Sequence, residues 1–186
     1  SYLMRPESGI EKISEITCWT AVAVCEAIKD CYGLDSQIKW VNDLIMGERK
    51  ICGILTEAVS LGSETLAYVV GIGINVGESD FPEEIKDIAA ALPLDEKEKN
   101  DLFFRVLEQI DAVLSEEKES IRSYLKEKSA VLGKPIRFFG ATDGEGIALD
   151  LDTNGGLIVT LDNGDVILAH GNDYGNSGGD LFSLGI

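Results

Sequence analysis

The segment from Lys39 to Asn75 most constrains the fold of this chain. It contains three runs rich in β-branched residues, 38–40, 50–60 and 65–75, separated by the turn-forming clusters 46–49 and 60–64. Such runs between such clusters are typical of antiparallel strands joined by tight connections. The pattern predicts two β-hairpins that bring a lysine, an Asn-Asp pair and a second asparagine to one end of one sheet.

The composition is strongly acidic. The 186 residues include 16 Lys or Arg and 33 Asp or Glu, which gives a formal charge of −17. Such a charge repels a phosphate backbone, so we expect no nucleic-acid binding. The sequence has no apolar run near the roughly 20 residues of a membrane span and no signal peptide at its start, so we expect no membrane association and a cytoplasmic location.

The four cysteines, Cys18, Cys25, Cys31 and Cys52, show no CxxC spacing of the kind used in zinc binding or thiol-disulfide exchange. Cys18 and Cys25 lie on a predicted helix about 10.5 Å apart along its axis, which is beyond the roughly 7 Å that a disulfide spans. We therefore predict buried free thiols, the common state of unpaired cysteine.

Helical patterns flank the predicted strands. Apolar residues recur at helical spacing over residues 13–28 and stop near Tyr32-Gly33, which predicts one long, mostly buried helix. Pro82 and the acidic residues after it are typical of a first helical turn, so we predict a helix from residue 81. A further helical region begins at Asp95 and carries an apolar stripe.

The pattern changes after Leu132-Gly133-Lys134-Pro135. Short predicted strands then alternate with hairpin-turn sequences such as Asn154-Gly155-Gly156 and Asn163-Gly164. The strands expected here are residues 136–139, 146–151, 157–161 and 166–169. We predict a small β-barrel, with a domain boundary near residue 132.

Taken one at a time, the polar residues of the first segment have simple structural explanations. Most lysines, like Lys50, are exposed, and the Asn42-Asp43 pair suits a turn. Gly71 and Gly73 either leave one sheet face bare for a flat ligand or mark a bulge or close helix packing. The run that starts at Gly71 lacks the glycine spacing of a dinucleotide-binding fingerprint, so we reject that fold.

Three motifs together resemble the biotin protein ligase family: Lys39-Trp40-Val41-Asn42-Asp43, Arg49-Lys50-Ile51-Cys52-Gly53-Ile54-Leu55-Thr56-Glu57 and Gly71-Ile72-Gly73-Ile74-Asn75. Residues 2–6 are similar to the strand after the family's biotin-binding loop, and residues 132–135 to the start of its C-terminal domain. The resemblance implies an α+β fold. A class II synthetase-like mixed sheet with helices is expected in a partial catalytic domain, residues 1–131, and an SH3-like β-barrel in residues 132–186.

The resemblance also implies a reaction. Members of the family use ATP and Mg²⁺ to convert biotin into biotinyl-5′-AMP, and then transfer biotin to a lysine of a biotin carboxyl carrier protein such as that of acetyl-CoA carboxylase. Lys50 is then the catalytic lysine and contacts biotin. The other residues expected at biotin are Gly53, Ile54, Gly71, Ile72 and Gly73; those expected at ATP are Lys39, Asn42, Asp43 and Asn75, with Asp43 also at the metal. Family members pair through their sheets, so we expect a homodimer.

The sequence departs from the family pattern at three points. Val41 stands where the family motif has proline, and residues 170–173 stand where the C-terminal domain has a Gly-Glu-Val motif. No GRGR-type loop occurs, and we expect the amino-terminal part of the catalytic domain that carries it to be missing. His170, the only histidine, is expected at the surface. Two alternatives to the ligase are a non-catalytic remnant or assembly module of the same fold, and an acyltransferase of the lipoate family.

Overall fold

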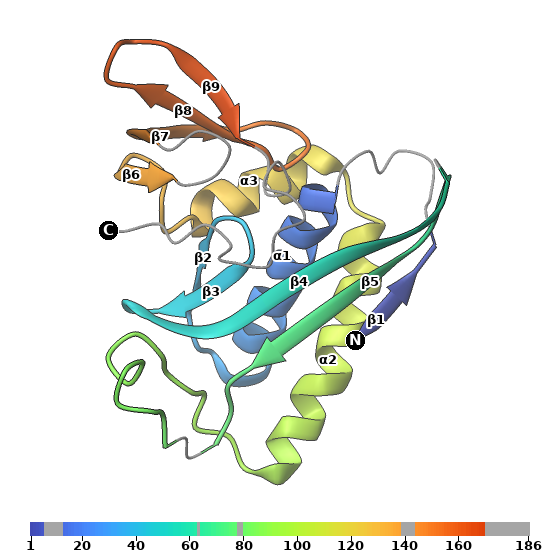
Figure 1. Ribbon diagram of the computed structural model, residues 1–186. Coiled ribbons are helices and arrows are strands. Elements are labelled where there is room, and N and C mark those ends of the chain that lie inside the picture. Colours follow the sequence, from blue (N-terminus) through green and yellow to red (C-terminus); the bar gives the residue numbers. More distant parts are fainter. Residues whose placement is uncertain (6–12, 63, 78–79, 139–143, 170–186) are drawn as a thin grey trace.

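The computed structural model describes residues 1–5, 13–62, 64–77, 80–138 and 144–169 (Figure 1). Its elements are β1 (Tyr2–Met4), α1 (Ile13–Tyr32), β2 (Gln37–Lys39), β3 (Asp43–Met46), β4 (Arg49–Leu61), β5 (Glu64–Ile74), α2 (Glu96–Leu114), α3 (Lys118–Lys128), β6 (Pro135–Phe138), β7 (Gly144–Leu151), β8 (Leu157–Leu161) and β9 (Val166–Ala169). His170 and the run after it lie outside the described residues, so what the sequence predicts for them stays a prediction.

The larger sheet has the strand order β1-β5-β4-β3-β2. The pairings among its five strands are all antiparallel, and parallel pairing in the described residues is limited to isolated bridges such as Lys50 with Ala89, so the mixed sheet implied by the family resemblance is not seen among the strands. The short connections explain this, because the turns at Gly47 and Gly62, with φ of 63° and 62°, reverse the chain within a few residues. The strands predicted over 50–60 and 65–75 are confirmed as β4 and β5. β1 pairs with β5, so β5 is not the outermost strand.

Helices cover one face of this sheet (Figure 1). The long buried helix predicted from sequence is confirmed as α1, whose residues Val24 and Ile28 are fully buried. Thr17 of α1 donates a hydrogen bond to Thr56 Oγ1 of β4 at 2.8 Å. Because side chains alternate along a strand, Cys52, Ile54 and Thr56 of β4 face α1, and odd-numbered residues such as the half-exposed Leu55 face away.

The helix predicted from residue 81 is wrong. This segment forms turns, and residues 88–92 lie beside the ends of β4 and β5 as backbone partners. The Lys50 N–H donates to the Ile88 carbonyl at 2.7 Å, and the Ala90 N–H donates to the Lys50 carbonyl at 2.9 Å. In a helix these backbone groups would bond to one another, but here they bond to β4. Tertiary contacts therefore override the local preference for helix.

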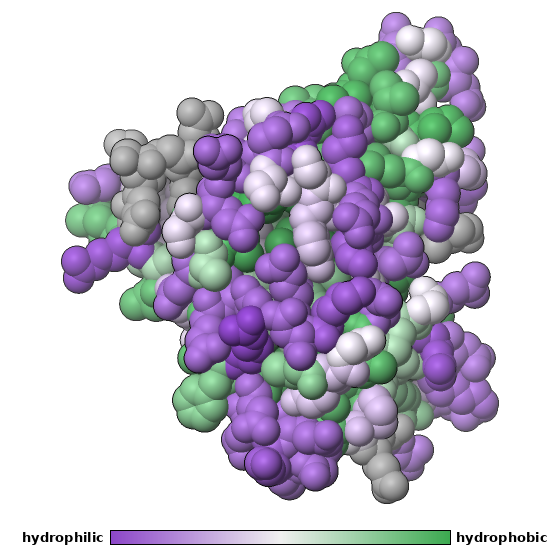
Figure 2. Space-filling model, turned by 180° about the vertical axis from the view of Figure 1, so that it is seen from behind, coloured by the Kyte–Doolittle hydropathy of each residue, from purple (hydrophilic) through white to green (hydrophobic). Residues whose placement is uncertain are grey.

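Helices α2 and α3 have the solvated faces expected of charged amphipathic helices. The helix predicted from Asp95 is confirmed as α2, which begins with a capping box between Asp95 and Glu98. Seen from the helix side, the surface of the molecule is mostly hydrophilic (Figure 2). In the described part of the chain, no helix has both the length and the apolar character needed to cross a membrane.

The second sheet is an antiparallel meander in the order β6-β7-β8-β9. The predicted barrel is not seen in the described residues, where the sheet is open, because a barrel needs its two outermost strands to pair and β6 and β9 do not. The core is continuous across both sheets and includes Leu151 and Leu157 of the smaller one. The domain boundary at residues 131/132 would fall between α3 and β6, and it stays a prediction.

Three of the four cysteines are buried, as predicted, and the prediction is wrong for Cys31, which is exposed near the end of α1. Burial raises the pKa of the Cys18 thiol to about 12, with the nearby Asp152 and Glu15 carboxylates adding to the effect. Burial, followed by the charge of Asp43, raises the pKa of the Cys52 thiol to about 12.

We expect iodoacetamide to alkylate Cys31 and to spare Cys18 and Cys52 in the native protein at about pH 8. The thiolate is the reactive form, and a buried thiol with a raised pKa is both protonated and inaccessible. Peptide mass spectrometry after a short pulse of reagent checks this. Labelling of Cys18 or Cys52 as fast as Cys31 would contradict the expectation, and denatured protein serves as the fully labelled control.

Candidate functional site

Four residues from four neighbouring strands form one row across the larger sheet. Lys39 of β2 lies opposite Asp43 of β3, which lies opposite Gly53 of β4, which lies opposite Gly73 of β5. Directly opposite residues of antiparallel strands point to the same face, so the row lies on the face that turns away from α1. The structure therefore brings residues predicted for ATP and residues predicted for biotin to one surface.

Lys50 reaches this row because of a β-bulge. The register shifts between Leu44 and Ile45, so that Ile51 of β4 has no opposite residue on β3. The Lys50 side chain then lies across Gly53, where an added Cβ would come within 3.1 Å of both Cε and Nζ of the lysine. Glycine at position 53 thus leaves the space that the lysine side chain occupies.

The Lys50 ammonium forms an ion pair with Asp43, with 2.6 Å between Nζ and Oδ1. The side chains are 46% and 22% exposed, so a ligand can reach the pair from solvent. Apart from this ion pair, Asp43 Oδ1 is buried and accepts no hydrogen bond from the described residues. An ionised carboxylate has about four acceptor positions, so Asp43 keeps capacity for a further cation.

Asn75 holds the backbone around Lys50. Its Nδ2 donates to the Ala90 carbonyl at 3.0 Å and to the Lys50 carbonyl at 3.4 Å, and its backbone N–H donates to the Ile51 carbonyl at 2.8 Å. The asparagine therefore lies at the same end of the sheet as Lys50, as the two predicted hairpins require. The backbone of Asn42 is held on β4, since its carbonyl accepts a hydrogen bond from the Ile54 N–H at 2.8 Å.

Gly71 and Gly73 leave the sheet face bare. A Cβ on Gly71 would lie 3.6 Å from the Leu55 carbonyl oxygen, and a Cβ on Gly73 would lie 3.8 Å from the Gly53 carbonyl oxygen, which are ordinary contacts. The β4–β5 register is regular at both glycines. Neither a bulge nor a closely packed helix therefore accounts for them, and free space over the strand is what they provide.

The structure does not bring the side chains of Ile54 and Ile72 to this face. These two residues are paired across β4 and β5, and Ile54 is 2% exposed in the core. Ile72 is partly buried and lines a cavity of about 220 Å³ beside α2. Both residues can contribute only backbone groups to a ligand that lies over the glycines.

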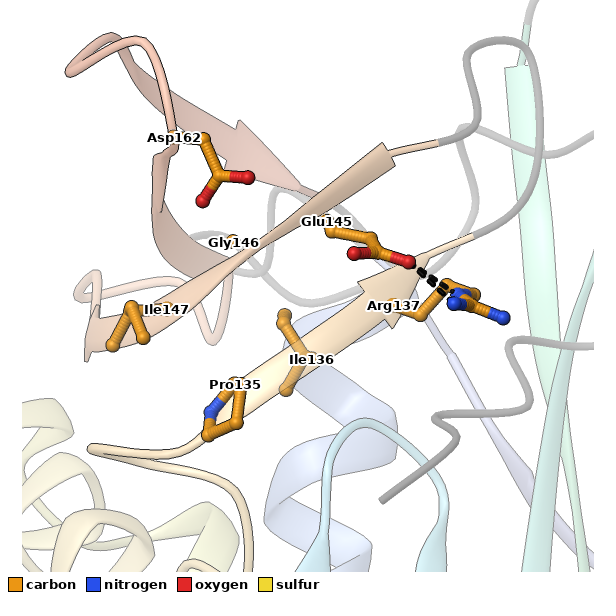
Figure 3. Close-up of a pocket in the computed structure, with 7 residues that line it drawn as sticks. All are labelled: Pro135, Ile136, Arg137, Glu145, Gly146, Ile147 and Asp162. Atoms are coloured by element: carbon orange, nitrogen blue, oxygen red, sulfur yellow. Dashed lines mark hydrogen bonds and ion pairs between the residues drawn. The ribbon is translucent and has the colours of Figure 1, made fainter.

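A second cavity, of about 380 Å³, lies on the smaller sheet (Figure 3). Among the described residues that line it, the one cation is Arg137, which is paired with Glu145 at 2.7 Å between Nε and Oε1, and the remaining ionisable group is Asp162. Such a lining repels carboxylates and phosphates. The row on the larger sheet is therefore the better site for anionic ligands.

Sequence reasoning missed two features at the site. The first is the segment 88–90, which pairs with Lys50 but has the local pattern of a helix. The second is Gly155, which the sequence marks only as a turn residue, and whose carbonyl oxygen accepts a hydrogen bond from the Trp40 indole at 2.8 Å. No sequence signal pairs a turn with a tryptophan 115 residues away.

Comparisons with known proteins find relatives of this chain. Residues 3–75 match the biotin/lipoate A/B protein ligase family. The bifunctional ligase/repressor BirA of Bacillus subtilis (strain 168) is 39% identical over 103 residues, which cover 54% of this chain and 32% of BirA. The biotin–[acetyl-CoA-carboxylase] ligase of Paracoccus denitrificans is 27% identical over 183 residues, covering 84% of this chain and 71% of the relative. The chain thus spans about a third of the length of the Bacillus protein.

Solved structures show the same fold. A mutant biotin protein ligase from Aquifex aeolicus in complex with biotin superimposes with a TM-score of 0.80 at 27% identity, covering 98% of this chain and 75% of the other. The Aquifex aeolicus enzyme in complex with biotin and ATP gives a TM-score of 0.76 at 27% identity, with coverages of 91% and 73%. In its matched segment, its relatives and its fold, the chain resembles the biotin/lipoate A/B protein ligase family.

Proposed function

We propose that the row of Lys39, Asp43, Gly53 and Gly73, with Lys50 lying across it, is the adenylation centre of a biotin protein ligase. The observation that carries the proposal is the exposed Lys50 ammonium above a glycine, 2.6 Å from a carboxylate that has acceptor capacity left. The reaction would join the biotin carboxylate to the α-phosphate of ATP and release pyrophosphate. The lysine amine of a biotin carboxyl carrier protein would then attack the biotinyl carbonyl, forming the amide and releasing AMP.

Lys50 would act as the electrophilic group. A carboxylate that approaches the phosphates of ATP meets repulsion between anions, and negative charge gathers on the α-phosphate oxygens in the transition state. An ammonium has three N–H donors, so Lys50 can keep one contact with Asp43 while it donates to the carboxylate and to a phosphate oxygen. Lys39 and Asn42, at the ends of the neighbouring turn, would contact the nucleotide.

The residues of the row fit a Mg²⁺ ion that is held largely by the phosphate oxygens of ATP. Among the described residues, no cluster of three or more His, Cys, Asp or Glu could hold a metal by itself. Asp43 offers one carboxylate, and Mg²⁺ at ATP sites is commonly bound by one or two carboxylates together with the phosphates. When bound, the ion would neutralise part of the phosphate charge.

Biotin would bind over the uncovered face of β5 at Gly71 and Gly73. Ile54 and Ile72 would contribute only backbone groups. Asn75 would support the Lys50 backbone near the phosphates. Two further proposals rest on the family resemblance. One is the finer fold assignment, with a class II synthetase-like domain in 1–131 and an SH3-like domain in 132–186; the other is a homodimer formed through the sheet. Nucleic-acid binding is not proposed, because the formal charge is −17.

Biotin-dependent exchange of labelled pyrophosphate into ATP tests the proposal. We expect the native protein to catalyse exchange with biotin and Mg²⁺, and not with lipoate in place of biotin. Exchange with lipoate alone would favour the lipoate-family acyltransferase. No exchange with either acid, in protein shown to be folded, would favour the non-catalytic remnant or assembly module.

Gly73→Val is expected to raise the KM for biotin at least roughly tenfold while the protein stays folded. A Cβ at this position makes only ordinary contacts, and β-branched residues suit strands, but the side chain covers the face that biotin needs. Exchange kinetics at varied biotin concentration give the result. Ala67→Val, on the same face of β5 but away from the row, is the matched control. An unchanged KM for Gly73→Val would exclude ligand contact at this glycine.

A further inference from the structure

A turn of the smaller sheet contacts the turn that carries the proposed ATP residues. The Gly155 carbonyl, in the β7–β8 turn, accepts a hydrogen bond from Trp40 Nε1 at 2.8 Å and from Cys18 Sγ at 3.7 Å. Trp40 is 4% exposed and Cys18 is fully buried. Two distant segments, one from α1 and one from the β2–β3 turn, thus share one acceptor on the smaller sheet.

The β7–β8 turn is organised so that this carbonyl points at the larger sheet. The Asp152 carboxylate accepts hydrogen bonds from the backbone N–H groups of Asn154 at 2.8 Å and Gly156 at 2.7 Å, and the Asp152 N–H donates to the Gly156 carbonyl at 2.8 Å. Gly155 has a φ of 77°, and a Cβ there would lie 3.0 Å from Cys18 Sγ. Glycine is therefore required at position 155 both for backbone conformation and for space.

Trp40 is the first residue of a three-residue turn between Lys39 and Asp43. The other end of that turn is fixed to β4, because the Asn42 carbonyl accepts from the Ile54 N–H at 2.8 Å. The turn is thus held at two points, one on its own sheet and one on the smaller sheet. Without one of these points, the turn would be held by the other and by the pairing of Lys39 with Asp43 and of Asp43 with Gly53.

We propose that the Asp152–Gly156 turn is a positioning element for the active site, which fixes the 40–42 turn through the Gly155 carbonyl and so sets the geometry of Lys39 and Asp43. The smaller sheet would then contribute to nucleotide binding without touching the nucleotide through this turn. The role in catalysis rests on the proposed function, whereas the positioning of the turn can be tested separately.

The test compares Gly155→Ala with Gly164→Ala. Both glycines have positive φ, 77° and 86°, and both lie in hairpin turns of the smaller sheet, so both variants carry similar backbone strain. An added Cβ meets Cys18 at Gly155 and meets nothing within 4 Å at Gly164. The chain has two tryptophans, so ¹⁵N-labelled protein gives two indole N–H signals that can be followed by NMR.

In Gly155→Ala we expect the Trp40 indole signal and the backbone amide signals of Asn42 and Asp43 to shift, and Gly164→Ala to leave them in place. We expect the KM for MgATP to rise roughly five- to tenfold, the range associated with loss of one hydrogen bond, with the KM for biotin unchanged. A global loss of stability would affect the KM values for both substrates and not that for MgATP alone. Unshifted indole and amide signals would overturn the positioning role.

Trp40→Phe covers the case in which Gly155→Ala does not fold. It removes the indole donor and keeps Gly155, so we expect the same shifts of the Asn42 and Asp43 amides and the same selective rise in the KM for MgATP. Shifted amides with an unchanged KM would overturn the link to nucleotide binding. If the wild-type protein shows no pyrophosphate exchange, the proposed function fails, and the amide signals still decide whether the smaller sheet positions the turn.

Discussion

Lys50→Ala is expected to slow biotinyl-adenylate formation about 100-fold, which corresponds to about 3 kcal/mol of lost transition-state stabilisation. The loss is of this size because the ammonium lies at the centre of the row, across Gly53 and beside Asp43. The fold should remain, since the lysine head group is exposed and the bulge is held by backbone hydrogen bonds. Biotin-dependent pyrophosphate exchange and urea unfolding measure the two effects.

Arg49→Ala is the matched control for this experiment. Arg49 is the neighbouring residue on β4, carries the same charge and is exposed. Its removal changes the net charge equally and should leave adenylation within about twofold of wild type, as expected for a surface side chain away from the reacting atoms. Equal losses in both variants would mean that general electrostatic attraction, and not the position of Lys50, supports the reaction.

Leu44→Ala is expected to lower the free energy of unfolding by about 2–5 kcal/mol. Leu44 is fully buried on β3, directly after Asp43, and its side chain lies on the helix side of the sheet. Truncation leaves a cavity in the core that joins α1 to the sheet, and neighbours in a packed core can only partly fill it. Urea-induced unfolding followed by circular dichroism gives the value.

Leu61→Ala serves as the comparison for stability. Leu61 ends β4 and is 72% exposed, so its truncation should change the free energy of unfolding by less than about 0.5 kcal/mol. Similar destabilisation in the two variants would contradict the assignment of the core to the α1 side of the sheet.

Much of the secondary structure could be predicted because local patterns and tertiary structure agree. The helix over α1 has apolar residues at helical spacing and a glycine after its last turn, and the β4–β5 hairpin has β-branched runs around Gly62. The segment after Pro82 could not be predicted in this way. Its local pattern is helical, but its backbone pairs with Lys50, and such a partner is far away in the sequence.

The placement of the candidate site residues could be predicted in part for a similar reason. Motif order placed Lys50, Asp43 and the glycines at one end of one sheet. The sequence alone indicates that side chains alternate between the two faces along β4 and β5, which places Ile54 and Ile72 on the opposite face from Gly53 and Gly73. The bulge at Ile51 could not be predicted from the sequence, because it depends on the pairing of β4 with β3. Without the bulge, Lys50 would point to the helix side of the sheet.

The row of site residues exists only while four strands keep their pairing register. A slip of β4 by one residue against β3 would turn Gly53 toward α1 and place an isoleucine or a cysteine where the glycine had been. The lengths of the turns at Gly47 and Gly62 maintain that register, although neither turn is part of the row. Insertion or deletion of a single codon in either hairpin would therefore break up the row in a protein that still contains every one of its residues.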